Sequence, residues 1–144
     1  MAGLGTVPLM ERVLFLHKVS LFDALDPADL QQVARIATER SFAEGELIFR
    51  QGEPGDAMYV VMTGGVRVEQ DGRAIATRGT GEAIGEMAIV GAAPRMASLI
   101  ADGDTRTLRI ARGDFESILR DRPETALGVI RVLSRRLSEA TAAR

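Results

Sequence analysis

Apolar residues recur at helical spacing in the first part of the chain, up to about Arg40. The start of a new helix is marked inside this block, where Asp26 can act as the N-cap, Pro27 suits the first helical position and Asp29 lies in the first turn. The pattern therefore predicts helices over residues 1–40. The expected buried face of the second helix consists of Leu30, Val33, Ala34 and Ala37.

Between about Ser41 and Ala111 the pattern changes to short apolar runs separated by glycines. The Asp71-Gly72 pair between two of these runs is a strong hairpin signal. Residues 85–89 interrupt the strand pattern and look like one turn of helix. Short strands and turn signals at this spacing predict an antiparallel sandwich or jelly roll. The expected strands contain residues 47–49, 58–62, 66–68, 74–76, 97–100 and 107–110.

Helical spacing returns in the last part of the chain. A short helix ends near Arg122, and Pro123 opens another, since proline is favoured at the first helical position. The fold class is therefore expected to be α+β, mainly β, with helices on both flanks of the strands. The expected apolar stripe of the last helix consists of Leu127, Ile130, Leu133 and Leu137.

The composition excludes several kinds of chemistry. The 144 residues contain no cysteine, one histidine (His17), and 18 basic against 20 acidic side chains, for a formal charge of -2. Disulfides and cysteine nucleophiles are therefore excluded, and a metal-dependent jelly-roll enzyme of the cupin type lacks the histidines for its metal. The near-neutral charge argues against nucleic acid as a partner.

No apolar run approaches the ~18 residues that a membrane span needs, and no signal peptide is visible. We therefore expect a cytoplasmic protein with no direct membrane insertion. The sequence offers no basis for an enzyme and no catalytic residue.

Two short segments of the β block carry a family resemblance. They are Ile-Gly-Glu-Met-Ala-Ile at residues 84–89 and Pro-Arg-Met-Ala-Ser at residues 94–98. Together they resemble the phosphate-binding cassette of cyclic nucleotide-binding domains, and residues 45–56 resemble the turn-rich start of that family's barrel. The resemblance covers nearly the whole chain. It implies an eight-stranded antiparallel jelly-roll β-barrel with flanking N-terminal and C-terminal helices.

The resemblance also implies that residues 1–144 form a single cyclic nucleotide-binding domain. Its parts would be the N-terminal helices at 1–40, the β-roll at 41–111 with the cassette at 84–98, and the hinge and lid helices at 112–144. No kinase pattern, pore segment or helix-turn-helix is present, so the effector domain or protein that such a sensor regulates is unidentified.

The residues of the cassette suit a cyclic nucleotide, which offers a phosphodiester, a ribose 2′-hydroxyl and a flat base. A helix that begins at Glu86 would present backbone N–H groups to an anion, and Gly85 lets the backbone come close. Arg95 can neutralise the phosphate with paired donors. The resemblance gives Glu86 the 2′-hydroxyl as its partner. The expected ligand-binding residues are Gly85, Glu86, Met87, Ala88, Arg95, Met96 and Ala97.

Three of these residues need further comment. Glu86 and Arg95 have a plainer interpretation as an ion pair across a turn, and Met87 as core packing. Met96 bears on the choice of ligand, because family members that prefer cyclic GMP often have a threonine here. A methionine offers no hydroxyl, so the resemblance implies that cyclic AMP is favoured over cyclic GMP.

The last helix is the expected lid. Its arginines, Arg131, Arg135 and Arg136, form a solvated face, or one of them or Leu133 closes over the base as in some relatives. The candidate lid contacts are Arg131, Leu133 and Arg135. The leading interpretation is a sensor that binds cyclic AMP, possesses no further cofactor, and couples binding to movement of its flanking helices. The alternative is a degenerate module that binds no nucleotide and acts as a protein interaction scaffold.

Overall fold

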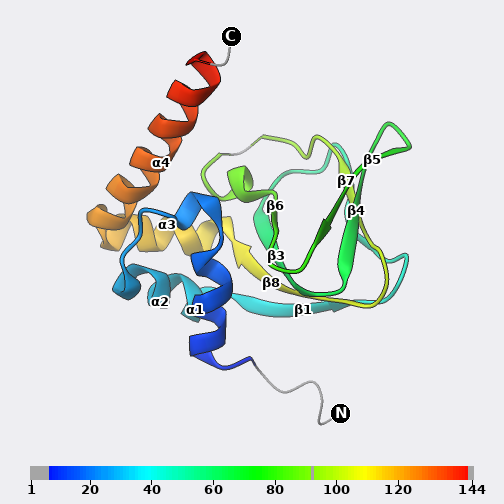
Figure 1. The fold of residues 1–144 in the computed structure, drawn as a ribbon, viewed down its shortest axis with the longest axis horizontal. Helices are drawn as coiled ribbons and strands as arrows, with labels where there is room; N and C mark the ends of the chain where they lie inside the picture. Colours follow the sequence, from blue (N-terminus) through cyan, green and yellow to red (C-terminus); the bar gives the residue numbers. More distant parts are fainter. Residues whose placement is uncertain (1–6, 92, 143–144) are drawn as a thin grey trace.

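The computed structural model describes residues 7–91 and 93–142 of the chain. Its α-helices gather at one end of a body of β-strands, and the β4–β5 hairpin lies at the opposite end (Figure 1). The helices are α1 (Leu9–His17), the 3-10 helix η2 (Ser20–Phe22), α2 (Pro27–Ile36), the 3-10 helix η3 (Glu86–Ile89), α3 (Arg112–Asp121) and α4 (Pro123–Ala142).

Eight antiparallel strands form two four-stranded sheets, with the orders β1-β8-β3-β6 and β2-β7-β4-β5. Chain segments that alternate between two sheets in this order make a double-sheet jelly roll. The expected eight antiparallel strands are confirmed, although the strand pairing of the described residues does not show a closed barrel. The strands are β1 (Thr38–Phe42), β2 (Leu47–Phe49), β3 (Ala57–Thr63), β4 (Gly65–Gln70), β5 (Arg73–Gly79), β6 (Ala83–Ile84), β7 (Ser98–Ala101) and β8 (Thr105–Ala111).

Two local predictions are confirmed by backbone geometry. The backbone N–H of Asp29 donates to the Asp26 carboxylate at 2.9 Å, so Asp26 caps α2. At the tip of the β4–β5 hairpin, Asp71 and Gly72 have φ angles of 53° and 79°. A tight hairpin turn of the I′ type needs positive φ at both of its central residues, which explains why Asp-Gly stands there.

Two strands were not expected from the sequence. β1 begins at Thr38, inside the block assigned to helices, and its residues are exposed or half-buried without strict alternation. It is an edge strand of its sheet, where its neighbour among the described strands is β8. β6 is two residues long. Strands so polar or so short carry no alternating apolar pattern, so periodicity cannot find them.

β3 is buried on both faces, which explains its unbroken apolar run. Met58, Val60 and Met62 join the main core beneath the helices, whereas Val61 joins a smaller cluster with Val66 between the sheets. Successive side chains of a strand point to opposite faces, so β3 separates the two cores. The helices therefore cover the outer face of β3, and the smaller cluster lies inside the roll.

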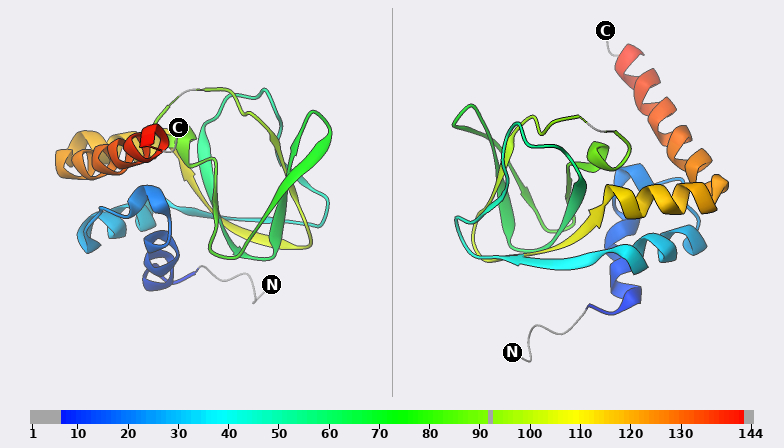
Figure 2. Two further views of the ribbon diagram at one scale, coloured as in Figure 1. Left: turned by 45° about the horizontal axis from the view of Figure 1, so that its top comes forward. Right: turned by 180° about the vertical axis from the view of Figure 1, so that it is seen from behind.

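The last helix turns a different face to the protein from the one predicted. Leu127, Ile130 and Leu137 are exposed, and α4 runs outward past the other helices to its C-terminus (Figure 2). The reason is that α4 lies very close to the segment before α2. A Cβ on Gly128 would lie 3.2 Å from the carbonyl oxygen of Ala24. Such a contact favours small side chains over leucines. The buried positions of α4 are Thr125, Gly128, Val129 and Val132.

Replacing Gly128 by valine is expected to destabilise the fold. A Cβ at Gly128 would already lie 3.0 Å from the Cδ2 atom of Leu25, so a branched side chain forces α4 away from the segment before α2. Overpacking of this kind costs about 1–3 kcal/mol, measured as the free energy of unfolding in urea. Gly113→Val in α3 is the matched control, since a Cβ there meets nothing within 4 Å. Equal losses in both variants would contradict the close packing of α4.

Candidate functional site

Arg95 is a buried arginine with one donor left unpartnered. The residue is only 7% exposed. Its Nη2 atom donates to the carbonyl oxygen of Ala57 at 2.7 Å, while its buried Nε atom has no hydrogen-bond partner among the described residues. A buried donor without an acceptor costs free energy. The guanidinium is therefore suited to an acceptor that comes from outside the chain.

The backbone around Arg95 is fixed by the turn that follows β2. The N–H of Arg95 donates to the carbonyl oxygen of Glu53 at 2.7 Å, and the N–H of Gly52 donates to the carbonyl oxygen of Arg95 at 2.8 Å. Pro54 and Pro94 form an isolated antiparallel bridge beside these bonds. The two segments that resemble the family, near residues 45–56 and 94–98, are thus joined into one unit.

An aromatic ring and a carboxylate lie next to the guanidinium. The ring centroid of Phe49 lies 3.9 Å from Arg95 Cζ, and an oxygen of Asp56 lies 3.7 Å from Arg95 Nη2. Asp56 also pairs with Arg109, at 3.8 Å, and its side chain is 65% exposed. Its ion pair with Arg95 is therefore weak. Burial lowers the pKa of Arg95, because it disfavours the charged form, and the carboxylate of Asp56 opposes this shift.

Gly85 makes room for Arg95. It caps η3 with a φ of 72°, and a Cβ at this position would lie 2.6 Å from Arg95 Nη1. Any other side chain would therefore push the guanidinium away, apart from the strain of a positive φ. The expected reason for the glycine was close approach of a ligand to the backbone, and the structure adds close approach of the arginine itself.

A cavity of about 270 Å³ opens in front of Arg95 and η3. Its walls are mainly apolar, and Arg95 is the charged side chain among them. Six of the seven expected ligand-binding residues line it, namely Gly85, Met87, Ala88, Arg95, Met96 and Ala97. The other lining residues are Phe49, Gly55, Val68, Ile84, Ala93 and Pro94.

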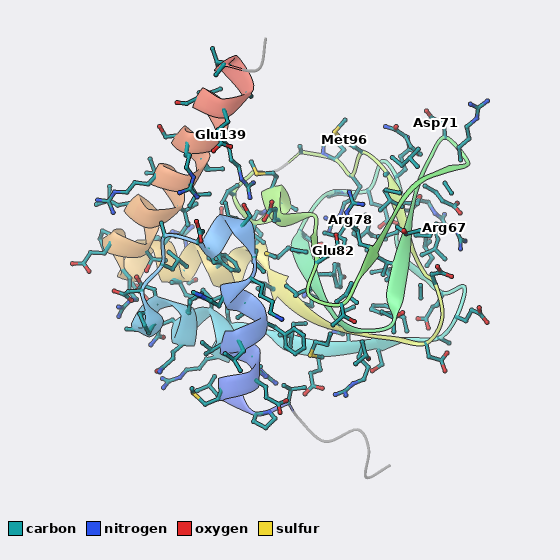
Figure 3. All side chains as sticks on the ribbon, viewed as in Figure 1. Arg67, Asp71, Arg78, Glu82, Met96 and Glu139 are labelled. Carbon is teal, nitrogen blue, oxygen red and sulfur yellow. The ribbon has the colours of Figure 1, made fainter. Side chains whose placement is uncertain are left out.

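The two methionines stand at the rim of this cavity. Met87 is 52% exposed and Met96 is 77% exposed, so the alternative interpretation of Met87 as core packing is wrong. Met96 points outward from the loop before β7 (Figure 3), and its carbonyl oxygen accepts a bond of 3.2 Å from the Gln70 side chain. The exposed methionines can therefore contact a ligand without rearrangement of the core.

Glu86 is the expected ligand residue that does not line the cavity. Its Oε1 atom lies 2.8 Å from Nη2 of Arg136 on α4. Arg136 also donates to the hydroxyl of Ser20 on η2 at 2.6 Å. The plain interpretation of Glu86 and Arg95 as partners is not met, because among the described residues each has a different ion-pair partner. Glu86 instead connects the cassette to the last helix.

None of the three candidate lid contacts lines the cavity in the described part of the chain. Arg135 pairs with Asp23 at 2.9 Å, Leu133 packs against the main core, and Arg131 lines a separate hollow beside α2. Arg136, one position from Arg135, is the arginine that reaches the cassette. Helical periodicity cannot separate such neighbours, because the choice depends on where the helix lies.

Sequence reasoning also missed the part of the site that comes from outside the cassette. Phe49 on β2 and Val68 on β4 look like ordinary strand residues, and only the fold brings them to Arg95. No group of three or more acidic, histidine or cysteine residues in the described chain could hold a metal ion. Likewise, none of the helices in the described segments combines the length and the apolar character that crossing a membrane requires.

Comparisons with known proteins match this chain to one family. A family model described as the cyclic nucleotide-binding domain matches residues 39–122. The Cyclic AMP receptor protein of Thermus thermophilus is 34% identical over 125 residues, which cover 83% of this chain and 58% of that protein. The solved N-terminal domain of a transcriptional regulator from Streptomyces coelicolor has a TM-score of 0.83 at 34% identity, over 90% of this chain and 96% of that chain.

A second similar structure is the regulatory domain of Toxoplasma gondii PKA in co-crystal with cAMP. Its TM-score is 0.72 at 27% identity, over 91% of this chain and 50% of that chain. The fold is thus a double-sheet roll with flanking helices, and its candidate site is a buried arginine beside a turn that begins with a glycine. Together they define a regulatory, ligand-binding class of domain. The chain belongs to the cyclic nucleotide-binding domain family, as the resemblance implied. It spans 58% of the length of the Thermus relative.

Proposed function

We propose that this chain is a sensor that binds a cyclic nucleotide in the cavity beside η3, with the phosphodiester on Arg95. The observation that supports this most strongly is the guanidinium itself, which is 7% exposed and has a buried Nε without a partner. A phosphodiester would supply the missing acceptor and a closer counter-charge than the exposed Asp56 provides. The other expected ligand-binding residues that line the cavity, Gly85, Met87, Ala88, Met96 and Ala97, would contact the sugar and the base.

Cyclic AMP is the ligand we favour, with cyclic GMP as the competitor. The names of similar proteins point to cyclic AMP, among them the Thermus Cyclic AMP receptor protein and the Toxoplasma PKA regulatory domain in co-crystal with cAMP. Met96 offers no hydroxyl to a guanine. The degenerate, scaffold-only alternative is not favoured, because Gly85, Glu86 and Arg95 are all present and Arg95 faces a cavity.

The test of this function is calorimetric titration of ligand-stripped protein with cyclic AMP, cyclic GMP and 2′-deoxy cyclic AMP. Saturable binding of cyclic AMP is expected, with weaker binding of the 2′-deoxy compound because it cannot donate to Glu86. Losing one hydrogen bond to a charged group should cost about 1.5–3 kcal/mol. Absence of binding by all three compounds would contradict the proposal and favour the scaffold.

Met96→Thr is expected to improve binding of cyclic GMP relative to cyclic AMP. Met96 is 77% exposed at the rim of the cavity, so a threonine hydroxyl there can reach a guanine and gain one hydrogen bond, about 1 kcal/mol. The ratio of the two dissociation constants measures the effect. Met87→Thr is the matched control, because it makes the same exchange at another exposed lining residue. An unchanged ratio in Met96→Thr would place the selectivity elsewhere.

We also propose that binding is coupled to α4 through Glu86. Glu86 pairs with Arg136 through Oε1, and the ribose 2′-hydroxyl would donate to the other oxygen of the same carboxylate. Arg135 and Arg136 also tie α4 to η2 through Asp23 and Ser20. A ligand shifts an equilibrium only by its different affinity for two states. Nucleotide would thus favour a state in which α4 covers the cavity and its contacts with η2 are exchanged, and an effector would read that change.

A further inference from the structure

The ring of Phe49 lies directly against the guanidinium of Arg95. The distance from Arg95 Cζ to the ring centroid is 3.9 Å, well inside the ~6 Å within which a cation over an aromatic face is attracted. Phe49 ends β2 and is half-buried, while Arg95 is almost fully buried. Cation–π contacts are stronger when they are removed from water. This contact therefore constrains where the guanidinium lies.

Phe49 is in turn held by other rings. The centroid of Tyr59 on β3 lies 6.0 Å from that of Phe49 and 6.3 Å from that of Phe42 on β1. Aromatic pairs attract at centroid distances of about 4.5–7 Å. Because Tyr59 is only 8% exposed, this row of rings has little freedom. It ends at Arg95 and gives the guanidinium a rigid surface to lie on.

The other contacts of Arg95 do not fix the plane of its guanidinium. A single hydrogen bond to Ala57 holds Nη2 at one point, and the guanidinium can still rotate about that bond. The oxygen of Asp56, at 3.7 Å, belongs to a side chain that is 65% exposed. Recognition of a phosphate by paired donors needs a fixed plane. The ring of Phe49 supplies the constraint that these polar contacts lack.

Phe49 and Arg95 also stand between two hollows of the roll. One is the cavity of about 270 Å³ beside η3. The other, of about 350 Å³, is lined by Phe49 and Arg95 together with Glu53, Asp56 and Arg109. Without the ring, the guanidinium could move from Gly85 toward the carboxylates of the second hollow. An internal ion pair there would compete with a phosphate for Arg95.

We infer that Phe49 is a positioning residue for the phosphate site, whose ring holds the guanidinium of Arg95 in place at the wall of the cavity. The inference rests on the proposed function, the binding of a cyclic nucleotide at Arg95. It means that β2, which lies outside the cassette, contributes to ligand affinity through Phe49. The aromatic ring, rather than apolar volume, is the feature that matters.

Calorimetric titration with cyclic AMP of the wild type, Phe49→Leu and Phe49→Tyr tests this. Phe49→Leu is expected to weaken binding about tenfold, since a desolvated cation–π contact is lost, whereas Phe49→Tyr keeps the ring and stays within about threefold. Equal affinity of Phe49→Leu and wild type would overturn the inference, as would equal losses in both variants. Should Phe49→Leu not fold, Phe49→Met, which fills the volume flexibly, takes its place.

The NMR resonance of the Arg95 Nε–H group in the unligated protein separates positioning from general packing. A proton that lies over an aromatic ring is displaced in chemical shift, so the wild type and Phe49→Tyr should share a displaced resonance that Phe49→Leu loses. The same resonance in all three proteins would overturn the inference. If the wild type bound no cyclic nucleotide, the proposed function would fail, and this resonance alone would decide whether Phe49 positions Arg95.

Discussion

Arg95→Met is expected to weaken cyclic AMP binding by two or three orders of magnitude while the protein stays folded. Arg95 carries the charge that faces the phosphodiester in an apolar cavity. Removing one partner of a desolvated, charge-assisted contact costs about 2–5 kcal/mol, and each 1.4 kcal/mol is tenfold in affinity. Calorimetry gives the dissociation constant, and urea unfolding gives the stability of the variant.

The stability of Arg95→Met should equal or exceed that of the wild type. Burial works against the charge of Arg95, and its Nε has no partner in the described structure. An apolar side chain of similar length removes both costs, which offsets the loss of the hydrogen bond to Ala57. A variant with lower affinity and unimpaired stability would separate a binding role from a structural one.

Arg109→Met is the matched control for Arg95→Met. Arg109 shares the carboxylate of Asp56 with Arg95, but it does not line the cavity beside η3. The control makes the same change in charge and should leave affinity within about threefold, because Arg109 lies outside the cavity and would not contact the ligand. Undiminished affinity in Arg95→Met, or equal losses in both variants, would contradict the assignment of the phosphate to Arg95.

Addition of cyclic AMP is expected to slow backbone hydrogen exchange in the cassette, residues 84–98, and also in residues 124–138 of α4. The second effect follows from the Glu86–Arg136 pair, which links the two segments at 2.8 Å. The second half of α4 is weakly packed, since the buried residues of this helix all lie within 125–132. Such a segment opens easily and can gain protection when it covers a ligand.

Arg136→Gln should reduce the gain in protection of α4 and leave that of the cassette, because the link to Glu86 is lost. Arg131→Gln is the matched control, since it neutralises an arginine of the same helix that lies beside α2 instead. It should leave both gains unchanged. Protection confined to the cassette in the wild type would contradict the lid and make the protein a passive binder.

Much of the fold could be predicted because its elements carry local signals. Asp26 and Pro27 mark the start of α2, and Asp71-Gly72 marks a hairpin whose turn needs positive φ. β1 could not be found, because an edge strand of mostly polar residues has no alternating apolar pattern. The face of α4 was misjudged because the rule that leucines are buried fails where a helix approaches a backbone as closely as at Gly128.

The candidate site divides in the same way. The cassette residues lie in two short segments close together in the sequence and include the glycine and arginine that a phosphate site needs, so the sequence indicates them directly. Phe49 and Arg136 come from distant strands and helices, and their approach to Arg95 and Glu86 depends on how the roll and α4 pack. Neither residue type nor spacing could have distinguished Arg136 from Arg135 and Arg131 beforehand.

The most direct test of the account is an NMR titration of isotope-labelled protein with cyclic AMP. If the phosphodiester binds at Arg95, the largest shifts will be those of the Arg95 Nε–H group and the backbone amides of residues 85–88 and 95–97. Shifts caused by movement of α4 are expected to be smaller near the hollow lined by Asp26, Glu124 and Arg131. Saturating shifts centred on that hollow, with the Arg95 Nε–H resonance unchanged, would contradict the account.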